Sequence, residues 1–341
     1  MRPRTSRAIA LSLAASLSLA APSAQAAPTE RRRARVGSRY LVSQQGRGGA
    51  IAAFTKFGST ADAIVAMVAA KRAPGAIRAA LRYLRRHPRA ADSIGLRAKL
   101  VLAVVAAGRN PRSFAQRNWV ARLRHAETAS GRYGRGAPVF EHALAVLALE
   151  ASGRGASDAA IAWLRRAQCA DGGWQYDSPP RPPENRHCRG PDPDFYTSEA
   201  DATALAVQAL AAAGAEPVRD ALAFFDLVRD LEVKGGWGYN HRFDITNANS
   251  TGLVLQAYAA EGVAPPARAV RALARLQYRL CGRNAGAFAF GYERRAGNPN
   301  RYRRTGPDVG ATIGAIPGLL GRALPIAAAS DLRRAPRTRR C

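Results

Sequence analysis

Two kinds of apolar segment alternate along the chain. Six segments are apolar almost all round, as in Ala202 to Ala213, and a helix without a polar face is buried. Six others carry Arg on one face, as in Ala73 to Arg86, and such amphipathic helices belong on the outside. The expected inner helices lie near 59–70, 93–107, 139–152, 199–213, 249–261 and 308–320, and the outer ones near 31–45, 73–86, 112–125, 157–168, 218–231 and 266–279. The pattern therefore predicts six helical hairpins.

Hairpins with buried inner helices favour closure into a barrel, because closure leaves no apolar end exposed. We therefore expect an all-α fold, an α6/α6 barrel over residues 27–324. β-branched runs bounded by turns are scarce, which argues against an all-β sandwich. The segment 178–197 holds six Pro and predicts a long loop at one mouth of the barrel. The basic tail, 325–341, is expected to fray.

A short motif recurs in the turns that follow the outer helices, with a period near forty residues. Its clearest copy runs from Trp163-Leu164 through Gln168 and Gly172 to Gly173-Trp174. Degenerate copies end at Gly49-Ala50-Ile51, Gly131-Arg132-Tyr133, Gly235-Gly236-Trp237 and Gly286-Ala287-Phe288, and Gln45 precedes the first of them. Gly permits a tight backbone, and Trp packs across neighbouring hairpins while its indole N–H finds a carbonyl. We therefore interpret Gln168, Gly172, Gly173, Trp174, Gly235, Gly236 and Trp237 as structural.

The motif at 163–174 resembles the repeat of squalene and hopene cyclases. The same α/α toroid occurs in protein prenyltransferase β-subunits and in cobalamin carriers of the transcobalamin type. The resemblance covers roughly residues 31–324 and implies six inner and six outer helices. It does not fix an activity, because the toroid serves several unrelated functions.

The catalytic motifs of these families are missing from the sequence. There is no Asp-x-Asp-Asp and no Asp-Asp-x-x-Asp, and Asp192-Pro193-Asp194 in the Pro-rich segment is the nearest approach. The Asp-x-Cys pair that holds zinc in prenyltransferases is also absent. These absences argue against either family's chemistry, and we expect no metal site.

Polar residues at the starts of the inner helices are the candidate site. Parallel inner helices must bring their first turns to one rim, where helix N-termini favour polar or anionic groups. The candidates are Asp62, Glu141, His142, Asp201, Thr203, Asn249, Thr251 and Asp308. The competing interpretation is that the acidic members only cap helices and pair with helix dipoles.

The leading hypothesis is a non-catalytic binder of a bulky apolar or amphiphilic molecule in the central cavity, whose walls of Ala, Leu and Val suit such a ligand. A terpenoid cyclase-like or prenyltransferase-like enzyme, or a carbohydrate-active enzyme with two rim carboxylates, is the alternative. A purely structural or wall-associated module is a third class. No cofactor is expected, and a corrinoid is implied by the resemblance alone.

The charge is large but scattered. Lys and Arg number 52 against 24 Asp and Glu, a formal net charge of +28. Arg occurs in every segment rather than in one cluster, which argues against a specific nucleic-acid partner. An anionic envelope surface remains a candidate partner at low salt, and we expect a monomer.

The N-terminus predicts export. Three Arg precede an apolar run from Ala8 to Ala21, and Ala24-Gln25-Ala26 follows, which is typical of a secretory signal cleaved after Ala26. The mature protein is then expected outside the cytoplasm, where cysteines oxidise. Cys169 and Cys188 bracket the Pro-rich segment and are predicted to form a disulfide, while Cys281 and Cys341 would pair or stay free.

Overall fold

The computed structural model describes residues 26–176, 197–241, 243–295 and 298–335. The expected signal sequence and most of the Pro-rich segment lie outside these residues, so both stay predictions. Within the described residues, no helix is long and apolar enough to cross a membrane.

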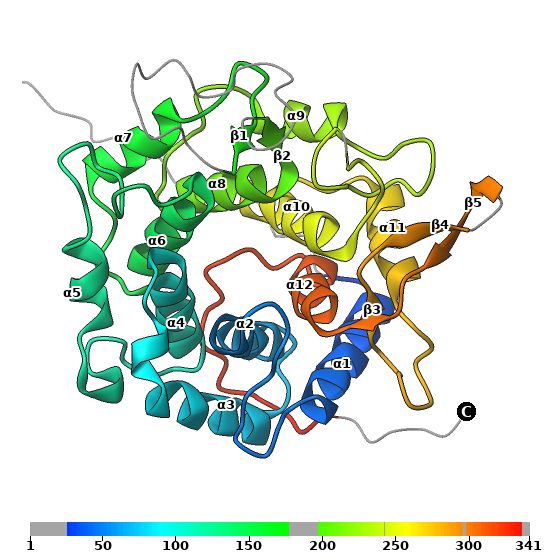
Figure 1. Ribbon diagram of the computed structural model, residues 1–341, viewed down its shortest axis with the longest axis horizontal. Coiled ribbons are helices and arrows are strands. Elements are labelled where there is room, and N and C mark those ends of the chain that lie inside the picture. Colours follow the sequence, from blue (N-terminus) through cyan, green and yellow to red (C-terminus); the bar gives the residue numbers. More distant parts are fainter. Residues whose placement is uncertain (1–25, 177–196, 242, 296–297, 336–341) are drawn as a thin grey trace, which may run out of the picture.

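Six parallel helices form the inner ring: α2 (Lys56–Ala69), α4 (Ile94–Ala106), α6 (Val139–Ala151), α8 (Ala200–Ala212), α10 (Ala248–Ala260) and α12 (Val309–Leu319). Each packs on the next, and α12 packs on α2, so the ring is closed (Figure 1). The tightest approach uses glycine, since a Cβ on Gly252 would lie 2.5 Å from the carbonyl oxygen of Gly314. The six apolar segments of the sequence are therefore the six inner helices.

The outer layer consists of α1 (Pro28–Ser43), α3 (Pro74–Arg86), α5 (Trp119–Arg124), α7 (Asp158–Arg166), α9 (Ala221–Leu227) and α11 (Ala267–Leu276). Several are shorter than predicted. The segment expected at 112–125 contains the short 3₁₀ helix η2 (Phe114–Gln116), where Ala115 has a φ of 53° that ends regular helix. A second 3₁₀ helix, η1 (Pro88–Ala90), follows α3.

The first helix closes the ring together with the last. Helices α3, α5, α7, α9 and α11 each pack on the inner helix that precedes them in the chain, whereas α1 packs on α12 (Figure 1). In the last copy of the motif, Gln277 Nε2 donates to the carbonyl oxygens of Gly286 (3.1 Å) and of Arg33 in α1 (3.0 Å). The N-terminal helix thus takes the place of an outer partner for the final inner helix.

The repeated motif joins each outer helix to the next. Gln168 Nε2 donates to the carbonyl oxygens of Gly172 and Arg219, both at 2.8 Å, and the indole N–H of Trp174 donates to Leu164 O at 2.8 Å. Gly172 has a φ of +88°, and a Cβ there would lie 2.4 Å from Asp220 O. The indole of Trp237 is likewise satisfied, by Phe225 O at 2.7 Å. These hydrogen bonds support the structural interpretation of the motif.

Three short antiparallel ladders qualify the all-α expectation: β1 (Trp174–Gln175) with β2 (Ser198–Glu199), β3 (Phe288–Ala289) with β6 (Pro307–Asp308), and β4 (Tyr292–Arg295) with β5 (Asn298–Arg304). In the first two, the motif aromatic lies opposite the residue that begins an inner helix, Trp174 opposite Glu199 and Phe288 opposite Asp308. The ladders were too short to leave a period-two pattern in the sequence. They fix where α8 and α12 start.

The C-terminal segment is packed, at least to residue 335, and does not fray there as predicted. It crosses the ring at the end where the inner helices finish (Figure 1). Leu324 N donates to Gln208 Oε1 of α8 (2.9 Å), and Ile326 is 5% exposed. Further on, Arg333 N donates to Lys71 O at 3.0 Å, and Ala73 N donates to Arg333 O at 2.8 Å. Apolar residues among the Arg hold this segment to the ring, so its composition alone was misleading.

Cys169 and Cys281 are the two described cysteines, and both are disulfide-bonded. Cys188 and Cys341 lie outside the described residues. The pairing of Cys169 with Cys188 therefore stays a prediction.

Candidate functional site

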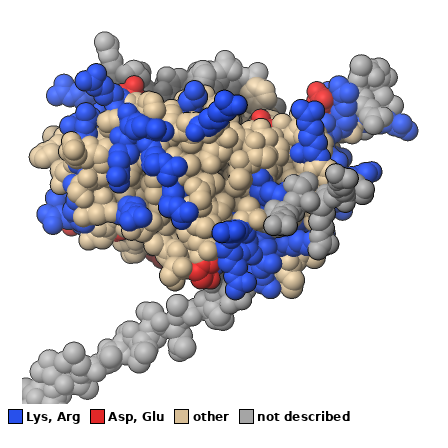
Figure 2. Space-filling model, turned by 90° about the horizontal axis from the view of Figure 1, so that it is seen from below, with Lys and Arg blue, Asp and Glu red and all other residues tan. Residues whose placement is uncertain are grey.

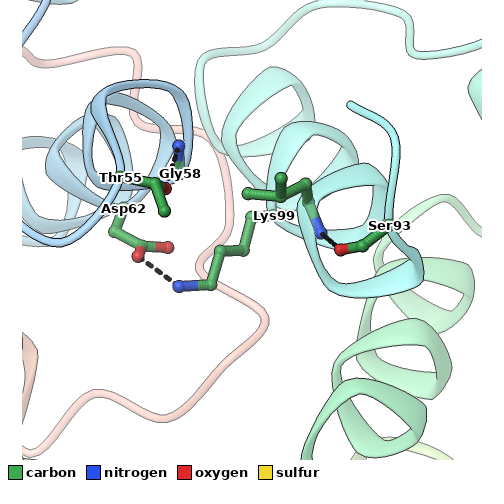
Figure 3. Close-up of polar contacts among 6 residues, drawn as sticks. Thr55, Gly58, Asp62, Ser93 and Lys99 are labelled. Atoms are coloured by element: carbon green, nitrogen blue, oxygen red, sulfur yellow. Dashed lines mark hydrogen bonds and ion pairs between the residues drawn. The ribbon is translucent and has the colours of Figure 1, made fainter. Parts of the chain in front are cut away.

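Five of the six inner helices are capped by a side chain at the mouth where they begin. Thr55 accepts from Gly58 N in α2, and Ser93 accepts from Leu96 N in α4, both at 3.1 Å (Figure 3). The other caps are Glu199 in α8, Asn247 in α10 and Asp308 in α12. Among the eight sequence candidates only Asp308 is a cap, so capping does not explain Asp62, Glu141, Asp201 or Asn249.

Two of these four are joined to neighbouring helices at the mouth. Asp62 Oδ2 forms an ion pair with Lys99 Nζ at 2.6 Å, from α2 to α4 (Figure 3). Glu141 Oε1 accepts from the Ser93 hydroxyl at 3.1 Å, from α4 to α6. Both acidic groups thus brace adjacent inner helices.

His142, Thr203 and Thr251 belong to the scaffold, contrary to the sequence prediction. All three are 0% exposed. Thr203 Oγ1 accepts from Trp174 N at 2.8 Å, Thr251 Oγ1 accepts from Trp237 N at 3.0 Å, and His142 Nδ1 accepts from Tyr133 N at 3.1 Å. The other ring nitrogen of His142 lies 3.1 Å from Ala160 O, and burial lowers the histidine pKa to about 3. These three side chains lie about one turn into their inner helices. They are hydrogen-bonded to the backbone of the preceding motif and do not face a ligand.

Asp201 and Asn249 meet in one cavity of about 580 Å³ at the mouth, between the starts of α8 and α10. We call it the rim cavity. Its lining is mostly aromatic, aliphatic and amide side chains: Asp201, Tyr239, Phe243, Asp244, Ile245, Thr246, Asn247, Asn249, Ser250, Phe290, Gly291, Tyr292 and Arg294. Phe243 is 65% exposed and Phe290 45% exposed. Large apolar side chains that stay in contact with solvent within a concave site are typical of ligand-binding surfaces.

Glu199 and Asp201 form a close pair of carboxyl groups beside this cavity. Glu199, 1% exposed, accepts from Asp201 N and Ala202 N, both at 2.6 Å, as the cap of α8. Burial raises the pKa of Glu199, and the charge of Asp201 raises it further. These two short N–H contacts act in the opposite direction, but the pKa of Glu199 remains raised.

Asp201 holds its proton more tightly than an ordinary carboxyl group. Burial raises its pKa to about 6, against the effect of a hydrogen bond with Ser250 that lowers it. Its Oδ1 is buried and has no hydrogen-bond partner among the described residues. The pKa of Tyr239, which lines the same cavity, is raised by burial and by the charges of Glu199 and Asp201. Asp201 therefore offers a free acceptor near neutral pH and a proton near pH 6.

A second cavity at the mouth, of about 800 Å³, lies at the starts of α4 and α6 and includes Glu141. Its lining is polar, with Asp92, Glu127, His125 and Arg135 among its residues, and it contains no aromatic carbocycle. The sequence candidates are thus divided: Asp201 and Asn249 share one cavity, Glu141 lies in another, and Asp62 and Asp308 line neither.

Sequence reasoning missed the residues that give the rim cavity its character. In the sequence Glu199 is only part of a predicted helix start, and Tyr239, Phe243 and Phe290 lie in turns outside the predicted helices. The available signal was the Glu199-Ala200-Asp201 spacing, two carboxyl groups at a buried helix start, where burial raises both pKa values. Within the described residues, no group of three or more His, Cys, Asp or Glu could hold a metal ion.

Comparison with known proteins finds structural relatives only. No family model matches the chain, and no curated protein matches it in sequence. Type II terpene cyclase MstE from Scytonema is similar in structure, with a TM-score of 0.57 at 14% identity, over 86% of this chain and 98% of the cyclase. Haptocorrin in complex with Cbi is also similar, with a TM-score of 0.53 at 13% identity, over 93% of this chain and 74% of haptocorrin.

The chain has the toroid fold of these proteins. At such low identity the likeness shows the fold and no activity. MstE has also been captured with geranylgeranyl dihydroxybenzoate as substrate, in a structure with a TM-score of 0.56 to this chain at 14% identity, over 86% of this chain and 97% of that one. The toroid fold that the sequence motif indicates is therefore present. The comparisons do not assign the chain to the squalene and hopene cyclase family.

Proposed function

We propose that this protein binds a bulky amphiphilic small molecule in the rim cavity and does not transform it. The observation that carries the proposal is the combination of an aromatic-lined cavity of about 580 Å³ with the unpartnered buried oxygen of Asp201. Small-molecule sites are commonly of roughly 300–1,000 Å³, apolar, with few polar groups that fix orientation. The binding site is thus at the mouth of the ring, near the starts of α8 and α10.

The polar part of such a ligand would have to donate a hydrogen bond. Asp201 Oδ1 is an acceptor without a donor, and leaving it buried and unpaired is costly. The apolar part would lie against Phe243 and Phe290, which are the exposed large apolar side chains of the cavity. An alcohol or amine on a bulky hydrocarbon meets both requirements.

Two structural neighbours support this ligand class. MstE binds a geranylgeranyl substrate and haptocorrin is complexed with Cbi, both bulky molecules held by a similar fold. A corrinoid is a candidate for this chain through that likeness alone, and a prenyl alcohol fits the chemistry of Asp201 more directly.

The test is native mass spectrometry of the purified protein mixed separately with geranylgeraniol and with cobinamide. We expect a one-to-one complex with at least one of them, weakened by Phe243→Ala combined with Phe290→Ala. Leu227→Ala is the matched control, because Leu227 is 73% exposed on α9 and does not line the rim cavity. Equal weakening by the control, or no complex with either molecule, would contradict the proposal.

Acid catalysis is the second candidate function, and the pKa of about 6 for Asp201 favours it. A protonated carboxyl group beside an apolar cavity can donate a proton to a bound substrate, as a terpenoid cyclase-like enzyme requires. Asp201→Asn would then retain geranylgeraniol and abolish any cyclised product detected by gas chromatography. A wild-type protein that binds the alcohol and returns it unchanged supports the non-catalytic function instead.

We also propose that the protein acts outside the cytoplasm after cleavage behind Ala26. The composition of residues 1–26 supports this. N-terminal sequencing of the secreted protein should begin at Ala27, and an intact Met1 on a cytosolic product would contradict it.

A further inference from the structure

A third cavity, of about 510 Å³, lies at the opposite end of the ring, where α2 and α12 finish. We call it the basic cavity. Six cationic side chains line it, and they come from three separate parts of the chain: Arg31 and Arg35 of α1, Lys71 and Arg72 after α2, and Arg322 and Arg333 of the C-terminal segment. Asp331 is the only acidic residue of its lining. Figure 2 shows Lys and Arg side chains in several groups over the face seen from below.

The backbone holds these groups in place. Arg333 forms a short parallel bridge with Arg72, through hydrogen bonds from Arg333 N to Lys71 O and from Ala73 N to Arg333 O. Lys71 Nζ pairs with Asp331 at 2.9 Å, so the one acidic side chain is already matched by one cation. The charge of Asp331 also acts on Arg72 and Arg333, so one carboxylate of the lining faces six cationic groups.

Arg72 is the centre of the argument, because it is buried without adequate partners. It is 9% exposed, and its one recorded side-chain hydrogen bond is a long contact of 3.5 Å to Lys71 O. No ion pair joins it to an acidic residue of the described chain. Burial lowers its pKa, and the charges of Arg35 and Arg333 lower it further, while the single carboxylate of Asp331 opposes them only in part.

A buried charge that is only partly compensated is unfavourable, and the neighbouring cations add to the cost. The start of α1 lies at the same cavity and contributes the positive end of a helix dipole. An anion at this place would therefore remove a cost that the free protein bears. Arg35 and Arg333 lie close enough to Arg72 to act on its charge, and each guanidinium group can donate two parallel hydrogen bonds to phosphate oxygens.

We propose that the basic cavity binds a phosphate group, either of a soluble phosphate ester or of an anionic lipid headgroup. A phosphate group presents several acceptor oxygens in different directions, and the cavity offers donors from α1, from the α2–α3 turn and from the C-terminal segment. This site is separate from the rim cavity, since the two lie at opposite ends of the inner helices. It holds whether or not the rim cavity binds an amphiphile.

Isothermal titration of the full chain with inorganic pyrophosphate, at about 0.15 M ionic strength to screen non-specific attraction, tests the proposal. We expect saturable one-to-one binding that Arg72→Gln combined with Arg333→Gln weakens by at least about tenfold. Arg78→Gln combined with Arg82→Gln is the matched control, because it removes the same charge from the exposed face of α3. The control should change the affinity less than about twofold.

Arg72→Lys separates charge from geometry. It keeps the positive charge and loses the planar pair of donors, so an intermediate affinity is expected. Folding of each variant is checked by thermal unfolding without phosphate, where loss of Arg72 should not lower the melting temperature because it relieves repulsion. Equal affinities of the site pair and the control pair, or no saturable binding, would overturn the proposal.

Co-sedimentation with phosphatidylglycerol vesicles, against phosphatidylcholine vesicles, identifies the source of the phosphate. A lipid headgroup as ligand predicts that the site pair loses vesicle binding and the control pair keeps it. A soluble ester as ligand predicts loss of pyrophosphate binding alone. A site pair indistinguishable from the control pair in both measurements contradicts either source.

Discussion

Glu199 and Asp201 are two positions apart at the start of α8, and their carboxyl groups have different hydrogen-bond partners. Both carboxylate oxygens of Glu199 accept hydrogen bonds from backbone N–H groups of the first helical turn, whereas Oδ1 of Asp201 has no partner among the described residues. A sequence shows the spacing of the two carboxyl groups but not which of them caps the helix. The distinction depends on a φ of −139° at Glu199, which places it just outside the helix.

The pKa of Asp201 makes a stability prediction. Folding raises that pKa from 3.8 to about 6, so between these pH values the folded protein binds more protons than the unfolded chain. The contribution of Asp201 to the free energy of unfolding therefore falls as pH rises through this window. Asp201→Asn removes the effect. The free energy of unfolding of the variant, relative to that of the wild type, should rise by an amount on the order of 1–3 kcal/mol between about pH 4 and pH 6. Above this window the difference between the two proteins should stay constant.

Urea unfolding of both proteins across this pH range measures that difference. His142 acts in the opposite direction, because its pKa is lowered from 6.5 to about 3 and its contribution is lost as pH falls below the unfolded value. His142 is present in both proteins, so its effect cancels in the difference. A pH-independent difference would show that Asp201 is ionised throughout.

Glycine at the motif turn gives a second prediction at the residue scale. Gly172→Ala places a Cβ 2.4 Å from Asp220 O at a φ of +88°, so strain and a clash with backbone add together. We expect a loss of more than about 2 kcal/mol in the free energy of unfolding. Gly153→Ala is the control, because its φ is +67° but nothing lies within 4 Å of the added Cβ, and it should lose about 1 kcal/mol. Similar losses in both variants would mean that the backbone at Asp220 moves and relieves the clash.

At the scale of elements, the apolar pattern predicted the inner helices to within a few residues and the outer ones less well. Inner helices are buried all round, so every position carries the signal, and α6 at Val139–Ala151 matches the expected 139–152. Outer helices have one buried face, and turn chemistry decides their ends. The helix α9 stops at Leu227, four residues before the expected end, because Asp230 is instead bonded to Val233, Lys234 and Thr246 in the following turn.

The hydrogen bond between an inner helix and the preceding motif is testable through Thr203. Thr203→Val keeps the shape of the side chain and leaves the buried N–H of Trp174 without its acceptor. We expect a loss of about 1–3 kcal/mol in the free energy of unfolding by urea. Thr29→Val, on the exposed surface of α1, should change stability by less than about 0.5 kcal/mol. Full stability of Thr203→Val would show that the hydrogen bond between Thr203 and Trp174 does not stabilise the ring.

For the whole molecule, sequence periodicity was enough to predict closure but not what fills either end of the ring. Closure follows from counting helices that must be buried. The rim cavity depends on aromatic side chains in turns, and the basic cavity on three segments far apart in sequence, neither of which leaves a periodic signal. Among the candidates taken from helix starts, Asp201 and Asn249 line the rim cavity, whereas Thr203 and Thr251 are buried in the scaffold.

Removing the C-terminal segment tests its role at the closed end. A chain that ends at Gly321 loses the buried Ile326 and the bond from Leu324 to Gln208. Burial of one such side chain contributes about 1.5–3 kcal/mol, so we expect at least that loss in thermal or urea unfolding. A chain that ends at Ala335 is the control, since both truncations lack Cys341. Equal stability of the two would show that the segment lies on the ring without supporting it.

The packing of α1 on α12 affects the order of folding during synthesis. The first helix to be synthesised has its buried face, with Val36, Tyr40 and Leu41, covered only when the last inner helix is complete. Contacts so distant along the chain form late, because a long loop must close before they contribute. Until then the nascent protein is an arc with two unmatched ends, exposed to aggregation and to proteases.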